Sequence, residues 1–364
     1  MSTVVGDDPV RPTPGPSPSP SLGSTTSVVL SPPVRDRRTG TRLVLLPDDA
    51  RLAALPRAEH SFLPAELDLT GEAPPMPGRG LRGERIVGAW TDQVDVVVLL
   101  ADGARYTLPH NPQSAASGHG WGVRLPARAI AADGSRLFYV ENGGLVVLTV
   151  DEPDPASHAP RAHVGFEVLD GAWTPGDEGI VLVGEHERLY VDITTGTTRR
   201  LTERAPGGYY QLAIEDQAGT PVPMLSTWSA RAKLTGRQGY PLPIAGVVGP
   251  TYSSLSGWAT AAVRPSTEAI LPATLPRALI GVVAVSGDSP NRKELLIDSP
   301  QTDAQVRCPG CVAPVGWASG SEVLVRLRGT QDQLVRWNTI TGQLSRESTI
   351  VGGDAHVLAV MSAS

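Results

Sequence analysis

The sequence predicts an all-β protein, and three observations support that prediction. Short apolar runs such as "VDVVVLL" (94–100), "RLFYV" (136–140) and "GIVLV" (179–183) alternate with Gly, Asp, Asn and Pro residues. Segments such as "AADGSRLF" (131–138) supply hairpin turns. No long window keeps a 3.6-residue apolar period, because the nearest candidate, "DDARLAALPRAEH" (48–60), is interrupted by Pro56.

The N-terminal segment differs from the rest of the 364-residue chain. Residues 1–38 are rich in Pro, Ser, Gly and Thr and contain almost nothing that could be buried, so we expect a disordered linker there. This linker is either a tail without further role or a spacer between a domain and an anchor. Residues 39–364 then form the folded domain.

An internal repeat indicates how the strands are organised. "GAWTPGDEGIVLVGEHERLYVDITTGTTRRL" (171–201) returns as "VGWASGSEVLVRLRGTQDQLVRWNTITGQLSR", which aligns Trp173 with Trp317 and Gly176 with Gly320. Weaker copies repeat at roughly 40 to 60 residues, the order of spacing of propeller blades. The residues that anchor the copies are Trp90, Ile130, Trp173, Leu212, Trp258 and Trp317.

These copies predict a single β-propeller with seven blades, and six blades is the close alternative; two β-sandwich domains would leave the matched modules unexplained. We expect each anchoring residue to lie on an inner strand, wedged between blades. The "D/N-x-x-T-G" turns would join the outer two strands, with Gly in the left-handed conformation. The segment Thr41–Leu69 could start the seventh blade, and Ala355–Met361 could supply the strand that closes it.

The quoted segments resemble the WD40-like or TolB-like β-propeller proteins common in actinobacteria, over most of residues 41–361. The Trp-Asp dipeptide of WD40 repeats is missing, with "RWN" in its place, and so is their Gly-His signature. The resemblance implies an external propeller behind a Pro/Ser/Thr-rich spacer and a membrane anchor. This chain has the spacer and no readable anchor, so we expect it to be either cytoplasmic or, if an upstream segment is missing, extracytoplasmic or membrane-anchored.

Composition limits the classes of partner. The net charge is −6 and the pI is about 5.7, which argues against a nucleic-acid-binding surface. No apolar run approaches the roughly 20 residues of a membrane span, and no signal peptide is readable at the N-terminus. We expect a monomer with a protein partner.

The two cysteines, Cys308 and Cys311, lie in "RCPGCVAP". A zinc site would need further ligands, and a thioredoxin-like pair would need a helix after the first cysteine. The segment therefore predicts either a small disulfide or two reduced thiols, and a disulfide would favour an exported protein.

No catalytic, metal or cofactor motif can be identified. G-x-S-x-G, P-loop, dinucleotide-binding, calcium-loop and sialidase motifs are all missing from the sequence. The loop "NPQSAASGHGWG" (111–122), with His119 and Trp121, is a candidate binding loop. We therefore expect a non-enzymatic scaffold that binds its partner through the loops; the alternative is a hydrolase or lyase with polar residues converging on the central channel.

Overall fold

The structure is a computed structural model of the chain. It describes residues 34–35, 40–77, 81, 84–91, 95–108, 122–150, 162–174, 177–204, 213–216, 244–253, 259–265, 280–285, 293–298, 311–352 and 357–362. Within these residues the single helix is α1 (Asp49–Ala53), which ends before Pro56 as the sequence indicates. No helix in this part of the chain is long and apolar enough to cross a membrane.

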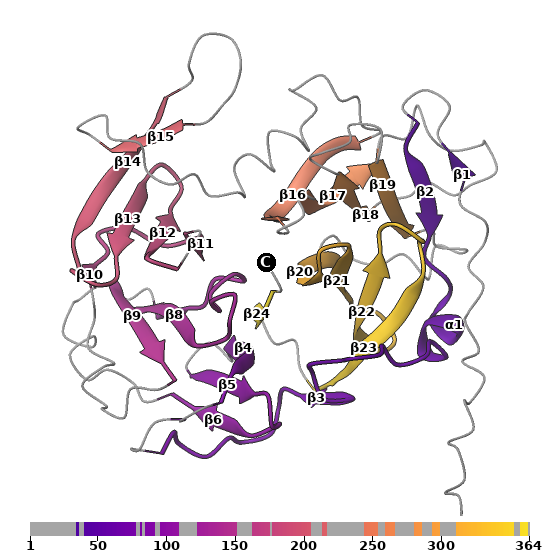
Figure 1. The fold of residues 1–364 in the computed structure, drawn as a ribbon, viewed down its shortest axis with the longest axis horizontal. Coiled ribbons are helices and arrows are strands. Elements are labelled where there is room, and N and C mark those ends of the chain that lie inside the picture. The colour runs from indigo at the N-terminus through magenta and orange to yellow at the C-terminus, as the bar shows by residue number, and fades with distance from the viewer. Residues whose placement is uncertain are drawn as a thin grey trace, which may run out of the picture.

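Five sheets, here called blades, lie around a common centre (Figure 1). Blade 1 has the strand order β24 (Val357–Val360), β4 (Ile86–Thr91), β5 (Val96–Leu100), β6 (Arg105–Thr107). Blade 2 has the order β7 (Val123–Arg124), β8 (Arg136–Glu141), β9 (Gly144–Thr149), β10 (Ala162–His163). Blade 3 has the order β11 (Asp170–Trp173), β12 (Gly179–Val183), β13 (Arg188–Asp192), β14 (Thr198–Arg204), β15 (Ala213–Asp216).

The last two blades also contain strands from the N-terminal part of the chain. Blade 4 has the order β16 (Ile244–Ser253), β17 (Ala259–Pro265), β18 (Ile280–Val285), β19 (Lys293–Asp298), β2 (Arg42–Leu45), β1 (Val34–Arg35). Blade 5 has the order β20 (Val312–Ser319), β21 (Glu322–Leu327), β22 (Asp332–Asn338), β23 (Leu344–Val351), β3 (Glu66–Asp68). Strand β1 lies inside the segment that the sequence assigns to a linker.

The repeated turns have the predicted geometry. Between β13 and β14, the Asp192 carboxylate accepts hydrogen bonds from the N–H groups of Thr194 and Thr195, both at 2.9 Å. Between β22 and β23, the Asn338 side chain does the same for the N–H groups of Ile340 and Thr341. Gly196 and Gly342 take φ angles of +69° and +80°, which favour glycine. The predicted side-chain bonds and glycine conformation are therefore confirmed, but the turns join the third and fourth strands of each blade, because β15 and β3 lie further out.

Apolar side chains from neighbouring blades share their cores. One cluster spans blades 1, 2 and 3, a second joins blades 4 and 5, and a third joins blades 5 and 1. Because a sheet with two apolar faces must cover both, stacking the blades side by side satisfies each of them. On blade 3 the face away from blade 2 also buries a small cluster, formed by Ala172, Val181, Tyr190 and Leu201.

Three of the anchoring tryptophans are buried in clusters between blades, but not all three lie on inner strands. Trp173 lies on the inner strand β11 and Trp317 on the inner strand β20. Trp90 lies on β4, which is the second strand of blade 1, because the C-terminal strand β24 takes the innermost place. The expected inner position of Trp90 is therefore wrong. Leu212 and Trp258 lie outside the described residues.

The expectation that residues 41–69 start a blade of their own is also wrong. Strand β2 pairs in parallel with β19 at the outer edge of blade 4, and β3 pairs in parallel with β23 at the outer edge of blade 5. Further along, Pro75 bridges in parallel to Thr107 of β6, the outer strand of blade 1. We call residues 41–76 the strap, because they follow the outer rim of three successive blades (Figure 1). Such coverage protects strand edges that would otherwise remain open for pairing.

The C-terminal strand closes a different blade from the expected one. Residues Val357–Val360 pair antiparallel with β4 of blade 1 and not with residues 41–69. The side chain of Ser362 then accepts a 3.0 Å hydrogen bond from the N–H of Trp317 in blade 5. The described residues form five sheets, so the counts of seven and six blades remain predictions.

Candidate binding face and central polar pairs

Strand register assigns every connection to one of two faces of the ring. In blade 3, Asp170 pairs with Val183, so the start of β11 and the β12–β13 hairpin lie at the same face. In blade 2, Val123 pairs with Glu141 and places the start of β7 beside the β8–β9 hairpin. An ion pair of 2.7 Å between Arg124 and Glu167 shows that these two ends lie on the same face.

Contacts between blades extend this assignment around the ring. At the opposite face, the N–H of Ile86 bonds to the carbonyl of Gly134, which aligns blades 1 and 2. The Ser362–Trp317 bond aligns blade 5 with blade 1. Arg42 pairs with Glu294 at the start of β19 and donates to the carbonyl of Thr339 in the β22–β23 turn, which aligns blades 4 and 5.

The connections on the two faces differ in length. On one face, here called the long-loop face, the strand ends are joined by residues 108–122, 266–279 and 299–311, together with shorter links. On the other, the tight-turn face, short turns such as 101–104, 193–197, 320–321 and 339–343 join neighbouring strands, and the longer connections 150–161 and 217–243 begin there. Loops of variable length on a rigid scaffold are where proteins most often place binding groups.

The candidate binding loop, the connection 266–279 and the segment before Cys311 therefore start and end at the same face. His119 and Trp121 of the candidate binding loop lie outside the described residues, and so does Cys308. Cys311 is buried at the start of β20, with 7% of its surface exposed. The disulfide between Cys308 and Cys311 remains a prediction.

Two ion pairs cross from the inner edge of blade 2 to that of blade 3. The Arg128 and Asp170 side chains meet at 2.5 Å and are mostly buried, whereas Arg124 and Glu167 are about half exposed. The backbone of Arg128 also bridges in parallel to Ala172. Charged groups near the centre of these blades are thus used to join neighbouring blades. Sequence reasoning missed these residues because they belong to no motif and pair across a separation visible only in the fold.

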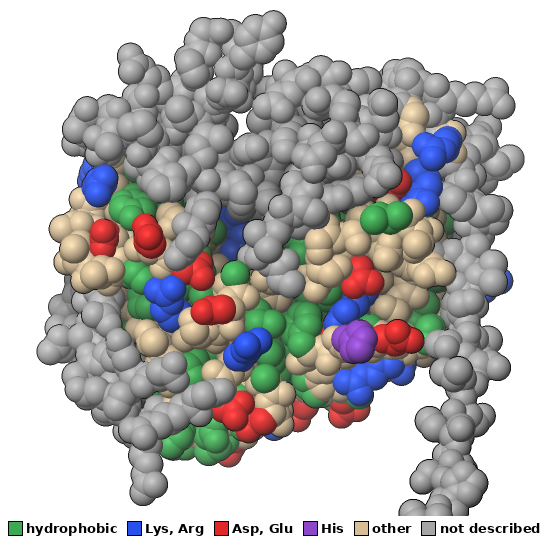
Figure 2. All heavy atoms as spheres, viewed as in Figure 1, with side chains coloured by type: hydrophobic (Ala, Val, Ile, Leu, Met, Phe, Trp, Pro, Cys, Tyr) green, Lys and Arg blue, Asp and Glu red, His purple; other side chains and the backbone are tan. Residues whose placement is uncertain are grey.

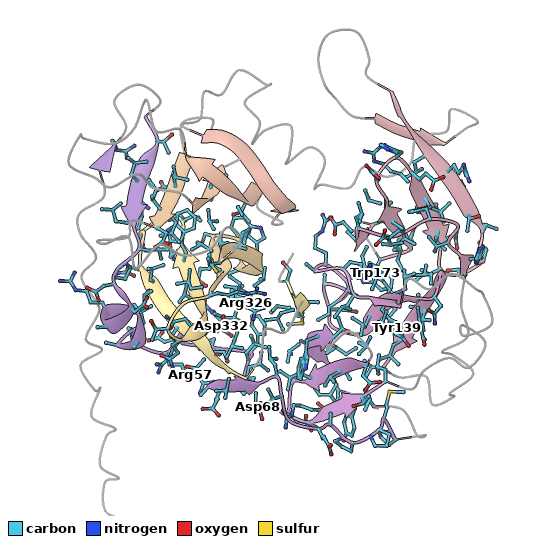
Figure 3. The ribbon with its side chains drawn as sticks, turned by 180° about the vertical axis from the view of Figure 1, so that it is seen from behind. Arg57, Asp68, Tyr139, Trp173, Arg326 and Asp332 are labelled. Carbon is cyan, nitrogen blue, oxygen red and sulfur yellow. The ribbon has the colours of Figure 1, made fainter. Side chains whose placement is uncertain are left out.

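Trp173 adds a directional contact between the same two blades. Its indole N–H donates to the carbonyl of Ala129 at 2.8 Å, and its ring meets Phe138 edge-on with centroids 5.6 Å apart. The guanidinium of Arg136 lies 5.0 Å from the centre of the Trp173 ring. Figure 3 labels Trp173, on β11 of blade 3, and Tyr139, on β8 of blade 2.

Near Trp173, two carboxylates at the tight-turn face have opposite pKa shifts. Burial raises the pKa of Asp177, Arg136 lowers it and the neighbouring Asp133 raises it, with a net increase. Burial also acts upward on Asp133, but hydrogen bonds from the Ser135 hydroxyl and N–H outweigh it, so the pKa of Asp133 lies below its ordinary value. Asp177 also has a positive φ of 55°, so this turn holds a strained residue.

No candidate metal centre occurs among the residues that the structure describes, since nowhere in them do three His, Cys, Asp or Glu side chains gather as ligands. On the face seen in Figure 2, the described basic and acidic side chains are interspersed, without a large area of one sign.

Comparisons with known proteins leave the family open. No family model matches the chain, and no curated protein matches it. Among solved structures, the chain is similar to a putative TolB from Agrobacterium tumefaciens, with 12% identity, coverage of 79% of this chain and 83% of that one, and a TM-score of 0.32.

Two further likenesses are equally distant. An oligogalacturonate lyase in complex with manganese has 10% identity, coverage of 89% of this chain and 86% of that one, and a TM-score of 0.39. A eukaryotic initiation factor has 10% identity and a TM-score of 0.30, and the match covers 71% of this chain and 62% of that one. At such values none of these proteins transfers an activity, ligand or partner to this chain.

Proposed function

We propose that this protein is a non-enzymatic, propeller-like scaffold that binds a protein partner through its long-loop face. The observation that carries the proposal is that strand register brings both ends of 108–122, 266–279 and 299–311 to one face. A rigid ring with variable loops on one side offers a broad surface for another macromolecule.

The arrangement near the centre supports a scaffold over an enzyme. The innermost position of blade 1 is taken by β24, whose Leu358 and Val360 are buried in the core between blades 5 and 1. Arg128 and Asp170, at the inner edges of blades 2 and 3, are engaged with each other. Charged groups paired in this way stabilise the joint between two blades.

Two exposed apolar side chains on opposite faces provide a matched test. Leu169, on the long-loop face, has 64% of its surface exposed, and Ile340, in a tight turn, has 53% exposed. We expect Leu169→Asp and Trp121→Ala to abolish in-cell crosslinking of the protein to its partner, whereas Ile340→Asp leaves the crosslink unchanged. Loss of the crosslink with Ile340→Asp alone would place the partner on the other face.

The enzyme alternative has its own readout. The purified protein is incubated with panels of glycoside, ester and uronate substrates, and products are followed by mass spectrometry. We expect no turnover. Turnover that disappears in the Asp170→Asn variant would instead assign the protein to the hydrolases or lyases and overturn the scaffold proposal.

A further inference from the structure

The strap is held against blade 5 by a buried ionic clamp. Glu347 is fully buried and Arg336 has 7% of its surface exposed, and the two side chains pair directly. Glu347 lies at a β-bulge, because Leu334 pairs with Ser348 while Val335 pairs with Arg346 and leaves Glu347 as the extra residue. The bulge turns the carboxylate toward the strap.

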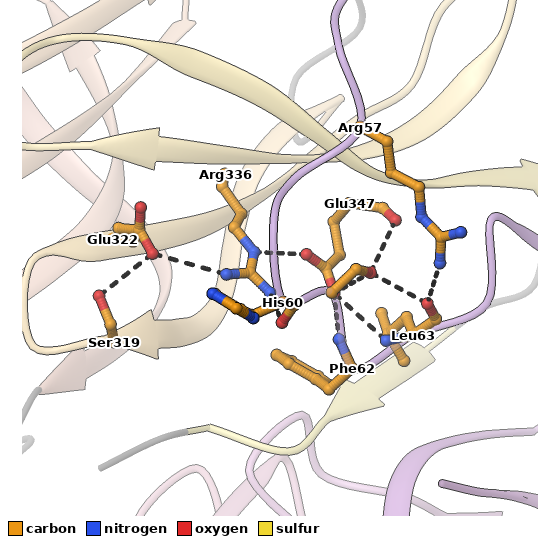
Figure 4. Close-up of polar contacts among 9 residues, drawn as sticks. Arg57, His60, Phe62, Leu63, Ser319, Glu322, Arg336 and Glu347 are labelled. Carbon is orange, nitrogen blue, oxygen red and sulfur yellow. Dashed lines mark hydrogen bonds and ion pairs between the residues drawn. The ribbon is translucent and has the colours of Figure 1, made fainter. Parts of the chain in front are cut away.

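The strap supplies the remaining partners of this clamp (Figure 4). One carboxylate oxygen of Glu347 accepts hydrogen bonds from the Ser61 hydroxyl at 2.8 Å and from the N–H groups of Phe62 at 3.1 Å and Leu63 at 3.3 Å. Arg336 donates to the carbonyl of His60 at 3.0 Å. The Glu347 carboxylate and the Arg336 guanidinium of blade 5 thus both bind backbone groups of the strap.

The same clamp contacts an apolar ring and a second acid. The Arg336 guanidinium lies 5.7 Å from the centre of the Phe62 ring and 3.6 Å from the Glu322 carboxylate. His60 takes a positive φ of 55°, a conformation that non-glycine residues rarely adopt. The strap therefore bends sharply at His60, whose carbonyl accepts the hydrogen bond from Arg336.

Two further clamps fix the ends of the strap. Arg42 pairs with Glu294 of blade 4, and Asp68 accepts from Arg105 of blade 1 through its carbonyl at 2.7 Å. The strap is followed in the sequence by "PGRGLRG" (77–83), which contains three glycines. A segment that adds strands to the edges of sheets and bonds to residues far away in the sequence has the form of a docked peptide.

We propose that the outer rim of blades 4, 5 and 1 is a peptide-docking site, occupied in the single molecule by its own strap and able to take the strap of a second copy in exchange. Recognition rests on parallel strand addition to β19 and β23 and on the Glu347–Arg336 clamp around residues 60–63. This site is on the rim and is independent of the proposed long-loop face.

The test keeps the whole chain. A site for a sequence-specific protease is inserted between Gly78 and Arg79, the folded protein is cut, and a fluorescent synthetic peptide of residues 40–77 is added. We expect the cut strap to remain bound in gel filtration, and the labelled peptide to replace it under native conditions, as followed by fluorescence anisotropy.

Peptide variants test the clamp without a risk to the fold. A Ser61→Ala peptide lacks one hydrogen bond to Glu347, so we expect its affinity to fall roughly fivefold. The matched control is a Glu59→Gln peptide, because Glu59 is exposed, and its affinity should not change. In the cut Glu347→Gln protein the unaltered peptide should bind about tenfold or more weakly, since the charge-assisted bonds are lost.

Three results would overturn the proposal. The first is unfolding of the protein on cleavage. The second is release of the cut strap only at the denaturant concentration that unfolds the ring. Either result would show that the strap is an inseparable part of the fold. Equal affinities of the Ser61→Ala and Glu59→Gln peptides would show that the clamp does not recognise the strap.

Discussion

Tyr139→Phe should stabilise the protein, because it removes a buried hydroxyl that lacks a partner. Tyr139 lies on β8 with 2% of its surface exposed, and its hydroxyl has no hydrogen-bond partner among the residues that the structure describes. A buried polar group left unsatisfied costs about 1–3 kcal/mol. Phenylalanine keeps the ring in the core between the blades, so we expect a gain of about 1–2 kcal/mol in the free energy of unfolding.

The size of the thermal shift follows from the length of the folded part. With an unfolding entropy of about 2.1 cal/mol/K per residue over roughly 320 residues, the total is about 0.7 kcal/mol/K. The expected increase in Tm is therefore about 1.5–3 °C, which differential scanning calorimetry resolves. Tyr106→Phe is the matched control, because Tyr106 is only half-buried on β6, and its variant should change the free energy by less than about 0.5 kcal/mol.

Alkaline pH provides an independent check on the same group. Burial, and then the charge of Glu141, raise the pKa of Tyr139 above the ordinary value of 10.0. Between the pKa of tyrosine in the unfolded chain and the higher pKa of Tyr139 in the folded protein, only the unfolded chain ionises. The wild-type protein therefore loses stability as the pH rises through this range and keeps it at lower pH. The advantage of the Phe variant should therefore widen above pH 10 by about 1.4 kcal/mol per pH unit. A Phe variant less stable than the wild type at pH 7 would refute this reasoning.

Three further predictions concern the joints between blades. Trp173→Phe should lower the free energy of unfolding in urea by about 2–4 kcal/mol more than Trp317→Phe does. The first variant loses the hydrogen bond to Ala129, whereas the second removes an indole N–H that has no partner in the described part of the chain; equal costs would contradict the assignment. Leu358→Ala should lower the free energy of unfolding, measured by calorimetry, by about 2–5 kcal/mol, because Leu358 is buried on β24, the strand that closes blade 1. A loss as small as that of a surface substitution would mean that β24 is dispensable. Asp177→Asn should stabilise the protein at pH 7, because burial raises the pKa of Asp177 and the charged carboxylate is therefore less stable in the folded protein than in the unfolded chain. The gain should vanish near pH 3, where the carboxyl group is protonated in both states; a gain independent of pH would show that strain is relieved instead.

The local parts of the fold are predictable because they depend on neighbours in the sequence. Alternating apolar residues give the strands, and the Asp192 and Asn338 turns form from side-chain bonds to N–H groups two and three residues later. The wedge positions of Trp173 and Trp317 follow from their recurrence at matching places in two copies.

The candidate site is less predictable than the strands. The sequence marks the irregular connections, but only strand direction shows that 108–122, 266–279 and 299–311 leave from one face. The pairs Arg128–Asp170 and Arg124–Glu167 join residues in different blades, and no local spacing indicates either of them.

The amino-acid order determines the all-β character and the hairpin turns, because each depends on contacts within one blade, and it marks the wedge residues by their recurrence in the copies. The partners of the two ends of the chain are decided only in three dimensions. Residues Arg42–Leu45 and Glu66–Asp68 carry the same pattern as any blade strand, yet they add in parallel to blades 4 and 5. The physical reason is that strand pairing satisfies the same backbone groups on any open edge, so the choice of edge depends on long-range contacts such as Arg42–Glu294 and the Glu347 clamp.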